Sequence, residues 1–463
     1  MTLAQNTPKL LATLAVCTQG NYEDGMLGLA LDPLFERNGW LYLYYSPAGP
    51  DSVQRLSRFL VAGDSLILTS EKVILEVPVQ RETCCHSAGD LQFGPDGLLY
   101  ISTGDNTSSK ESSGYSPIDE RPGRGPYDAQ KSSANTHDLR GKILRVKPKA
   151  DGSYAVPQGN LFPPDGSQGA PEVYVMGLRN PFRFTVDFPT GYVLWGEVGP
   201  DTGLDGPQGP QSYDEFNLAR QPGFYGWPYF IADQKAYPDW DFATNTPGSM
   251  QDPKRPQNNS PYNYGARDLP PAQPSLIWYP YGPSLIWPVL GQGSRSAMGG
   301  PLYRYDRYQG KNKLPRYYDG KWFIYEWARD WIMCVEFGPD WRPVQITPFL
   351  TEWKLNNPID LKLGRDGSLY VLEYGSNYFA NNDDARLTRI AYHEGNRQPV
   401  ARIEASTLRG AHPLPVILDA STSFDHDPDD ELHYEWNLPG KTWTGPQLSY
   451  TFERPGVYRP QLT

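Results

Sequence analysis

A histidine and an aspartate flank one predicted β-hairpin. His86 precedes the predicted strand 88–93, and Asp105 follows the predicted strand 98–103. In an antiparallel pair, the residue before the first strand lies at the same end as the residue after the second, so the two side chains are expected to be neighbours. A histidine held by a carboxylate is suited to general-base catalysis near neutral pH. The simpler interpretation, in which His86 caps a strand and Asp105 forms an Asx turn, stays open.

A second hairpin places an arginine at the corresponding end. Arg179 precedes its first strand and the Gly-Pro-Asp stretch 199–201 follows its second, while Glu23 and Asp24 lie at the same end of the first hairpin of the chain. An arginine binds or polarises a carbonyl or carboxylate group, although a structural salt bridge is an equally simple interpretation of Arg179 alone. If the hairpin ends converge, an acid, a His–Asp pair and an arginine share one cleft.

The scaffold that would bring these ends together is a repeated sheet unit. Strand, tight turn and strand recur at 28–45, 90–105, 182–197 and 359–374, with a looser copy at 318–327. Their Asp-Gly, Asn-Gly and Thr-Gly turns suit antiparallel hairpins. Such repetition predicts an all-β propeller in which each unit is one blade. The long Gly-, Pro-, Ser- and Asp-rich insertions are predicted to be loops on one face: 106–138 and 202–300.

Composition narrows the class of protein. The 463 residues include 42 Lys and Arg against 53 Asp and Glu, a formal net charge of −11, and this sign disfavours binding to a phosphate backbone. Hydrophobic residues make up 38%, too many for a disordered chain, and 45 Gly with 46 Pro disfavour a helical bundle. The longest apolar runs are far shorter than the ~20 residues that a membrane-spanning helix needs, so no membrane span is expected.

The ends and the cysteines bear on location. No signal peptide is visible after Met1, and the chain is expected to be a fragment, because it ends at Thr463 inside a predicted strand. Cys84 and Cys85 are adjacent, so a disulfide between them would be strained, and two semi-buried thiols are the alternative. A metal site at Cys84, Cys85 and His86 is disfavoured, because three consecutive residues fit poorly around one tetrahedral ion.

The texture changes near residue 396. A Gly-Asn-Arg-Gln-Pro linker is followed by short predicted strands at 400–405, 415–419, 432–436, 449–452 and 457–462. These predict a small Ig-like β-sandwich at 396–463 that lacks its last strand, after a propeller domain at 1–395.

Several motifs resemble those of the soluble quinoprotein glucose/sorbosone dehydrogenases. The stretch 84–105 is similar to the family signature, as are shorter motifs that appear in family order between residues 20 and 375: 23–30, 138–145, Gly-Leu-Arg-Asn-Pro at 177–181, 199–201, 214–217 and Tyr-Gly-Trp-Pro at 225–228. The resemblance implies a six-bladed propeller that binds pyrroloquinoline quinone (PQQ) and Ca²⁺ on its upper face, and whose first blade could be incomplete here at the N-terminus.

The resemblance also implies roles for individual residues. His86 is implied to be the base that takes the hydroxyl proton of a sugar, Asp105 its orienting carboxylate, and Arg179 the group that polarises the quinone carbonyl. The remaining positions are implied as cofactor contacts (Asn180 and Glu23), as carbonyl ligands of a Ca²⁺ ion next to the cofactor (Gly199 and Pro200), and as a second, structural Ca²⁺ site (Asp214 and Glu215).

The sequence departs from the family in its cofactor cations. The glucose-oxidising members have two arginines where this chain has Asn-Asn-Pro-Ile-Asp at 356–360, and their cofactor lysine falls near Ala328. Arg329 is the candidate substitute. The vicinal cysteines and the insertion 106–136 resemble a multidomain subgroup, and the tail resembles a PKD domain whose Asp run could bind Ca²⁺ or form a turn. These features imply an extracytoplasmic protein, periplasmic or secreted.

Three functional hypotheses follow. The leading one is a PQQ-dependent oxidoreductase that acts on a sugar or polyol and passes electrons to an acceptor such as a cytochrome or a quinone. The second is a Ca²⁺-dependent, non-redox sugar-processing enzyme of the lactonase or lyase type, which the missing arginine pair favours. The third is a carbohydrate-binding surface protein with the PKD module as a spacer.

Overall fold

The chain divides into two units, Met1–Ala391 (unit 1) and Tyr392–Thr463 (unit 2). The computed structural model describes residues 9–17, 23–83, 85–108, 110–378, 380–392, 395, 399–425, 430–438 and 441–463. The expected boundary at 395 and 396 falls close to this division, and the identities of the two domains remain predictions.

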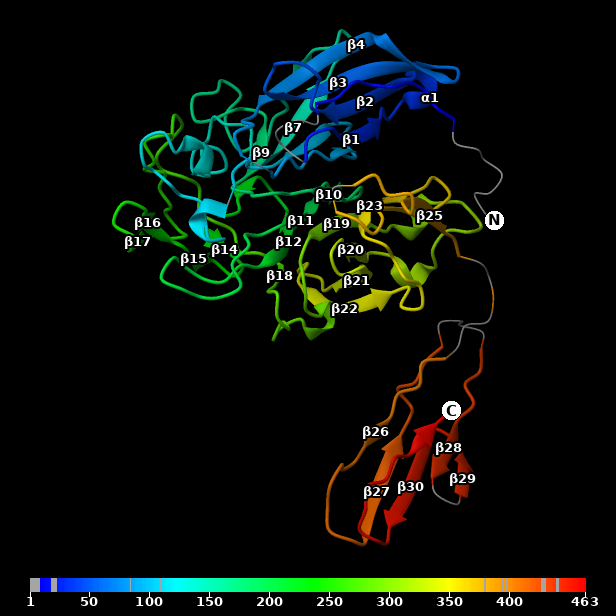
Figure 1. Ribbon diagram of the computed structural model, residues 1–463. Helices are drawn as coiled ribbons and strands as arrows, with labels where there is room; N and C mark the ends of the chain where they lie inside the picture. The colour runs from blue at the N-terminus through cyan, green and yellow to red at the C-terminus, as the bar shows by residue number, and fades with distance from the viewer. Residues whose placement is uncertain are drawn as a thin grey trace. The chain divides into compact units, whose positions relative to one another are not determined.

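Unit 1 is built from almost entirely antiparallel sheets, each made largely of consecutive strands (Figure 1). The sheets with three or more strands are β1 (Met26–Leu31), β2 (Trp40–Tyr45), β3 (Val53–Ala62) and β4 (Ser65–Pro78); β5 (Leu91–Phe93), β6 (Leu99–Thr103), β7 (Lys142–Pro148) and β9 (Val173–Met176), with β8 (Tyr154–Ala155) and β13 (Gly223–Phe224); β10 (Arg183–Val186), β11 (Val193–Glu197), β12 (Asp214–Ala219) and β18 (Ile277–Tyr279); β19 (Ala297–Leu302), β20 (Trp322–Glu326), β21 (Trp331–Phe337) and β22 (Pro343–Phe349); and β23 (Pro358–Leu363), β24 (Leu369–Glu373) and β25 (Arg386–Ile390).

Helical structure in unit 1 is short. The described residues contain one α-helix, α1 (Phe35–Asn38), and single turns of 3₁₀-helix at Lys110–Ser112, Gly125–Tyr127, Pro288–Leu290, Tyr305–Arg307 and Arg316–Tyr318. The all-β fold class is therefore confirmed, whereas the number of six blades remains a prediction. No helix among the described residues has the length and apolar character required to cross a lipid bilayer.

The insertions differ from each other. In the described part of 106–138 the only regular elements are two 3₁₀ turns, as predicted for a loop. The prediction of a loop throughout 202–300 is wrong, because β12 and β18 complete the third sheet, and this stretch also holds two small hairpins: β14 (Phe230–Ile231) with β15 (Lys235–Ala236), and β16 (Pro238–Asp241) with β17 (Thr246–Met250). Irregular spacing hid these strands from a search for repeats.

The first strands of neighbouring sheets pack side by side. β5 contacts β1 and β10, and β19 contacts both β10 and β23. Lys362 on β23 reaches across to Asp90, just before β5, with Nζ 3.0 Å from Oδ1. The hairpin ends of several sheets consequently approach one another, which is the arrangement that the site requires.

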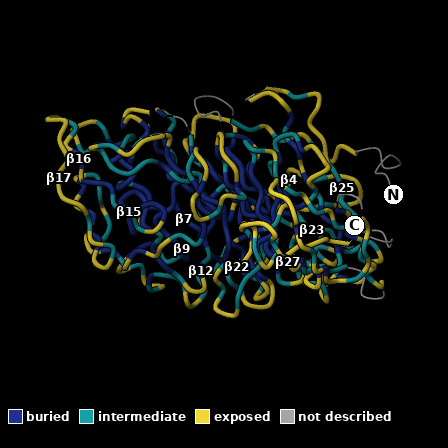
Figure 2. Tube along the Cα trace, turned by 90° about the horizontal axis from the view of Figure 1, so that it is seen from below, coloured by how far each residue is buried: buried dark blue, intermediate teal, exposed yellow. Residues whose placement is uncertain are grey.

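Large apolar side chains fill the space between sheets. Trp195, Phe216 and Trp322 are fully buried, and each such side chain contributes about 1.5–3 kcal/mol when removed from water. Figure 2 shows buried residues along β7 and β9, whereas β17 is exposed along its length. The hairpins are thereby held on a rigid core, and the polar residues at their ends inherit fixed positions.

Unit 2 has two three-stranded antiparallel sheets around a buried tryptophan, Trp436. They are β26 (Glu404–Ala405), β27 (Leu414–Asp419) and β30 (Gln447–Phe452), and β29 (Lys441–Thr444), β28 (Glu435–Leu438) and β31 (Gln461–Leu462). Most of the Asp run that was considered for Ca²⁺, residues 426–429, lies outside the described residues. The PKD assignment stays a prediction.

Candidate active site

A tight hairpin positions the histidine and the aspartate. β5 and β6 pair from Leu91 with Ile101 to Phe93 with Leu99, and the Asp-Gly turn between them uses Gly97 at φ 72°. At the opposite end, His86 Nδ1 lies 2.6 Å from Asp105 Oδ1, as the hairpin geometry predicts. The contact joins positions that are 19 residues apart in the chain.

Backbone packing explains how the histidine reaches this position. His86 has a left-handed backbone (φ 61°), a conformation that costs on the order of 1 kcal/mol or more for a side chain with a Cβ. Its carbonyl lies so close to Gly104 that a Cβ there would stand 1.9 Å from the His86 oxygen. Glycine at position 104 therefore permits the approach that brings His86 over Asp105.

Three donors converge on the Asp105 carboxylate. Oδ1 accepts from the backbone N–H of Thr107 at 2.9 Å as well as from His86, and Oδ2 accepts from Trp227 Nε1 at 2.8 Å. Because an ionised carboxylate only accepts, the proton of a neutral His86 must be on Nδ1. The lone pair of Nε2, for which no protein partner occurs among the described residues, is thereby available to a substrate.

The arginine loop abuts this pair directly. The backbone N–H of Asp105 donates to the Arg179 carbonyl at 2.7 Å, and Asn180 Oδ1 accepts from the N–H of Ala88 at 3.1 Å. Glu23 Oε2 accepts from the N–H of Ser87 at 2.8 Å. The structure thus brings together the ends of three sheets, with Glu23, His86, Asp105, Arg179 and Asn180 in one contiguous network.

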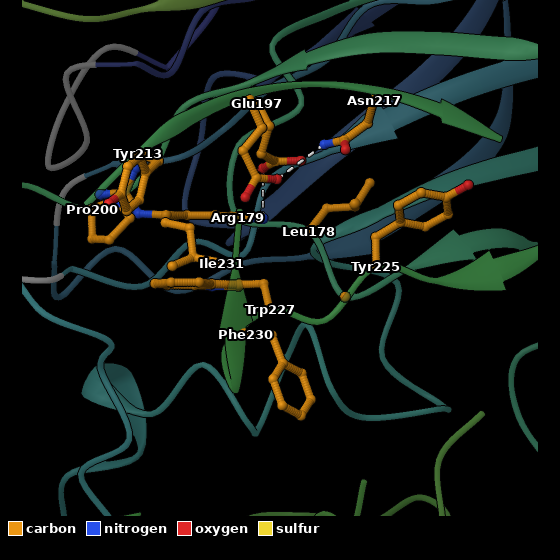
Figure 3. Close-up of a pocket in the computed structure, with 13 residues that line it drawn as sticks. Leu178, Arg179, Glu197, Pro200, Tyr213, Asn217, Tyr225, Trp227, Phe230 and Ile231 are labelled. Atoms are coloured by element: carbon orange, nitrogen blue, oxygen red, sulfur yellow. Dashed lines mark hydrogen bonds between the residues drawn. The ribbon is translucent and has the colours of Figure 1, made fainter. Parts of the chain in front are cut away.

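A small pocket lies beside Arg179 (Figure 3). Arg179 extends between Pro200 and Tyr213 on one side and the Trp227 ring on the other, and its Nη1 donates to the Val198 carbonyl at 2.9 Å. Its guanidinium carbon is 5.9 Å from the centre of the Trp227 ring. A buried cation therefore faces a pocket next to the His86–Asp105 pair.

Two glutamates line the pocket, and one of them, Glu197, holds the arginine loop. Glu197 Oε1 accepts from the backbone N–H groups of Arg179 and Asn180 at 2.8 and 2.6 Å, and Glu197 is the cross-strand partner of Glu215. Burial, and then the neighbouring Glu215, raises the pKa of Glu197 to about 8; burial raises the pKa of Glu215 to about 7. Two buried carboxyls on directly opposite residues disfavour two negative charges, so the protonated form of at least one of them is favoured.

Pro200, predicted for the calcium ion next to the cofactor, and Asp214, predicted for the second calcium ion, both contact Arg295. The Pro200 carbonyl accepts from Arg295 Nη2 at 2.9 Å. Asp214 accepts from the N–H groups of Gly199 and Ala297 and lies 3.4 Å from Arg295 Nη1. This donor set does not suit Ca²⁺, because a guanidinium already stands where the oxygens converge.

The other predicted carboxylate ligand is engaged as well. Glu215 accepts from the N–H of Ala232 and from Asn217 Nδ2. Within the described ranges, no group of three or more His, Cys, Asp and Glu side chains is arranged to hold a metal ion.

Arg329 does not join the site in this structure. All five of its N–H donors are directed to backbone carbonyls: those of Pro280, Leu290, Gly291, Gly293 and Ser294, at 2.8 to 3.1 Å. The side chain therefore anchors the loop 280–294 and has no remaining N–H for a cofactor carboxylate.

Three residues of the site were missed by the sequence analysis. Trp227 lies in a motif that was recognised without a role, and nothing in its neighbourhood predicts that its indole reaches Asp105 from 122 positions away. Glu197 ends a predicted strand at the expected end, so its position carried a signal. Arg295, in an irregular Gly-Ser-Arg-Ser stretch, carried none.

The prediction of a disulfide or two thiols at Cys84 and Cys85 can be followed in the structure only at Cys85. Cys84 lies outside the described residues, Cys85 is in a disulfide, and Cys17 and Cys334 form no disulfide.

The chain is similar to a known protein family and to several curated proteins. The family model described as Glucose / Sorbosone dehydrogenase matches residues 4–264. Quinoprotein glucose dehydrogenase B of Acinetobacter calcoaceticus is 28% identical over 238 residues, which cover 48% of this chain and 44% of that protein. HIPL1 protein of Arabidopsis thaliana is 30% identical over 174 residues (35% and 21%), and human Hedgehog-interacting protein is 30% identical over 182 (36% and 23%). The chain thus spans less than half the length of these relatives.

Solved structures support the fold. An oxidoreductase of Thermus thermophilus, described as a glucose dehydrogenase, superposes with a TM-score of 0.51 at 24% identity, covering 82% of this chain and 86% of that one. The apo-form soluble aldose sugar dehydrogenase of Escherichia coli gives 0.52 at 20% identity, covering 80% and 84%.

Proposed function

The chain belongs to the glucose/sorbosone dehydrogenase family, and we propose that unit 1 oxidises a hydroxyl of a sugar or polyol with PQQ as the hydride acceptor. The observation that carries this proposal is the 2.6 Å contact of His86 Nδ1 with Asp105 beside the Arg179 pocket. It supplies a base and a cation within one network.

The site fits the reacting end of PQQ. Arg179 is a buried cation that lines the pocket, and Asn180 and Glu23 belong to the same network, so these residues would hold the quinone end. Bound PQQ would supply a two-electron acceptor for the hydride of a carbinol carbon. The carboxylates of the cofactor have no comparable partner at 356–360, and the guanidinium of Arg329 is fully engaged. Ca²⁺ forms no part of the proposal, because Arg295 already contacts two of its predicted ligands, Pro200 and Asp214.

The role of His86 follows from its hydrogen bonds. With Nδ1–H donated to Asp105, Nε2 accepts the proton of the substrate hydroxyl, and Asp105 stabilises the imidazolium that forms. The resulting alkoxide makes the carbinol C–H bond a better hydride donor, so that the C–O bond becomes a carbonyl. Arg179 offers N–H donors to an oxygen in the pocket that gains negative charge.

The test replaces the base and leaves the cofactor contacts in place. His86→Ala is expected to lower dye-linked aldose oxidation by about 10²–10⁴-fold while PQQ binding, followed by absorbance, stays measurable. His137→Ala, at an exposed histidine, is the control and is expected to keep full turnover. Turnover in His86→Ala equal to that of the parent would exclude the base role.

A non-redox reaction is the second candidate, and the full engagement of Arg329 favours it. The same His86–Asp105 pair would then activate water against a sugar lactone, or abstract a ring proton, without PQQ. The two candidates are separated by adding PQQ and aldose: stoichiometric binding with quinone reduction supports oxidation, whereas lactone turnover in the absence of PQQ supports the second.

Location and partners are proposed from the same family membership. We expect an extracytoplasmic protein, periplasmic or secreted, that acts on a small-molecule sugar and passes electrons to a cytochrome or quinone. Fractionation of the native host followed by immunodetection tests the location.

A further inference from the structure

Arg295 is buried beside the loop that carries the predicted calcium ligands. It lies just before β19, and its side chain is 1% exposed. Nη2 donates to the Pro200 carbonyl at 2.9 Å and to Ser212 Oγ at 2.7 Å, and Nη1 is 3.4 Å from Asp214 Oδ1. One guanidinium thereby connects three oxygens that come from two separate segments of the chain.

The cluster needs a positive charge. Asp214 is buried and accepts from the backbone N–H groups of Gly199 and Ala297 in addition to its ion pair with Arg295. A buried carboxylate without a cationic partner is strongly destabilising. Arg295 supplies that partner and also stacks on Tyr281, with the guanidinium carbon 3.9 Å from the ring centre.

Pro200 is an expected ligand of the calcium ion next to the cofactor and Asp214 of the second calcium ion, and both residues belong to this cluster. Ca²⁺ takes carbonyl and carboxylate oxygens at roughly 2.3–2.6 Å, and it would have to approach the Pro200 carbonyl, to which Arg295 donates, and the Asp214 carboxylate, with which Arg295 is paired. A divalent ion placed there would also be repelled by the buried positive charge of Arg295. Arg295 and Ca²⁺ are therefore alternatives at this position.

We propose that Arg295 is the resident cation of this loop: it holds Pro200, Ser212 and Asp214 together as a metal ion would, so that the pocket wall is assembled from protein groups alone. Gly199 and Pro200 line the same pocket as Arg179, so Arg295 acts on the site through the loop, as a positioning residue. This proposal does not depend on which reaction the site performs.

Calcium stoichiometry of the full chain tests the proposal. Isothermal titration with CaCl₂ is carried out on the parent protein, Asp214→Asn and Arg295→Met. The parent and Asp214→Asn are expected to bind equal numbers of ions, because ions bound elsewhere do not use Asp214. Arg295→Met, which frees the oxygens of Pro200, Ser212 and Asp214, is expected to bind one additional ion and to gain several degrees in melting temperature on addition of calcium.

Two further variants separate this role from general stabilisation. Arg304→Met removes another arginine that is paired with a buried carboxylate, Asp187, and is expected to lose stability without an additional calcium ion. Arg295→Lys keeps the charge and is expected to bind no additional ion.

An ion that the parent binds and Asp214→Asn loses would overturn the proposal, as would a folded Arg295→Met with the stoichiometry of the parent. If Arg295→Met does not fold, the comparison of the parent with Asp214→Asn decides: equal stoichiometry supports the resident cation, and loss of one ion overturns it. No readout involves turnover, so a failure of the proposed oxidation is distinguishable.

Discussion

The ends of β6 and β20 occupy equivalent places in their sheets, each following the second strand of a hairpin, yet their polar residues do opposite things. Asp105, after β6, accepts hydrogen bonds from His86, Trp227 and Thr107. The Nε2 atom of His86 is then available to a substrate. Arg329, after β20, donates all its N–H groups to backbone carbonyls. The position at a strand end therefore determines where a side chain lies. Its hydrogen-bond partners determine whether that side chain contributes to ligand binding or to stability.

The largest expected effect falls on the β6 end. Asp105→Asn puts an amide NH₂ where three donors converge, so His86 is expected to reverse its tautomer and present a protonated Nε2 to the substrate. Sugar oxidation should fall about 10³–10⁴-fold in kcat, while PQQ binding is retained. Steady-state kinetics with a dye acceptor and a cofactor titration measure both quantities.

The matched control for this variant is Asp96→Asn, at the opposite end of the same hairpin. Asp96 accepts a turn N–H from Leu98, and an asparagine serves that purpose equally well. Its kcat should be unchanged. If Asp105→Asn lost cofactor binding together with turnover, Asp105 would be a structural residue and the contrast between the two strand ends would disappear.

The β20 end should respond in stability rather than activity. Arg329→Met removes five charge-assisted hydrogen bonds to the 280–294 loop, and the expected loss is about 2–4 kcal/mol in the free energy of unfolding. Urea denaturation measures it. The affinity for PQQ is expected to stay within about 2-fold, because every Arg329 donor is engaged by the chain; a large fall in PQQ affinity would return Arg329 to the cofactor site.

Sequence reasoning succeeded where the signal is local. An Asp-Gly turn with alternating apolar residues predicts a hairpin, and the geometry of antiparallel pairing then brings His86 to Asp105 without knowledge of the rest of the fold. The gathering of Glu23, Arg179 and Asn180 needed in addition that neighbouring hairpins pack in sequence order.

Partners supplied by the long insertion could not be predicted. Trp227 and Arg295 both belong to the 202–300 region. Because its strands are short and irregularly spaced, the sequence of this region has no repeat from which its fold could be predicted. The residue type of Arg329 indicates a cation but not its acceptors, because backbone carbonyls leave no mark in the sequence. Two of the expected calcium ligands, Pro200 and Asp214, contact Arg295 in the folded chain. Their motifs do not reveal this contact, because Arg295 comes from a distant segment.

The smallest effect is expected at the buried Glu197 and Glu215, which make the stability of the fold depend on pH. Their folded-state pKa values are raised, to about 8 and about 7, so these two carboxyls bind more protons in the folded chain than in the unfolded chain above about pH 4.5. Their contribution to the free energy of unfolding should therefore fall as pH rises from about 5 to about 8. Glu326, whose pKa burial also raises to about 8, contributes in the same direction.

Glu215→Gln isolates the contribution of the pair. Asn217 Nδ2 donates to Glu215 at 3.1 Å, and its buried Oδ1 has no hydrogen-bond partner among the residues that the structure describes. A rotated Asn217 amide can therefore accept from the new Gln NH₂. Removing the Glu215 charge also removes one cause of the raised pKa of Glu197. The variant is expected to gain on the order of 1–2 kcal/mol over the parent at pH 8 and nothing at pH 5, measured by urea denaturation across that range. Glu352→Gln, at an exposed position, should track the parent at every pH. A parallel offset of Glu215→Gln at all pH values would show that the pair does not titrate in this window.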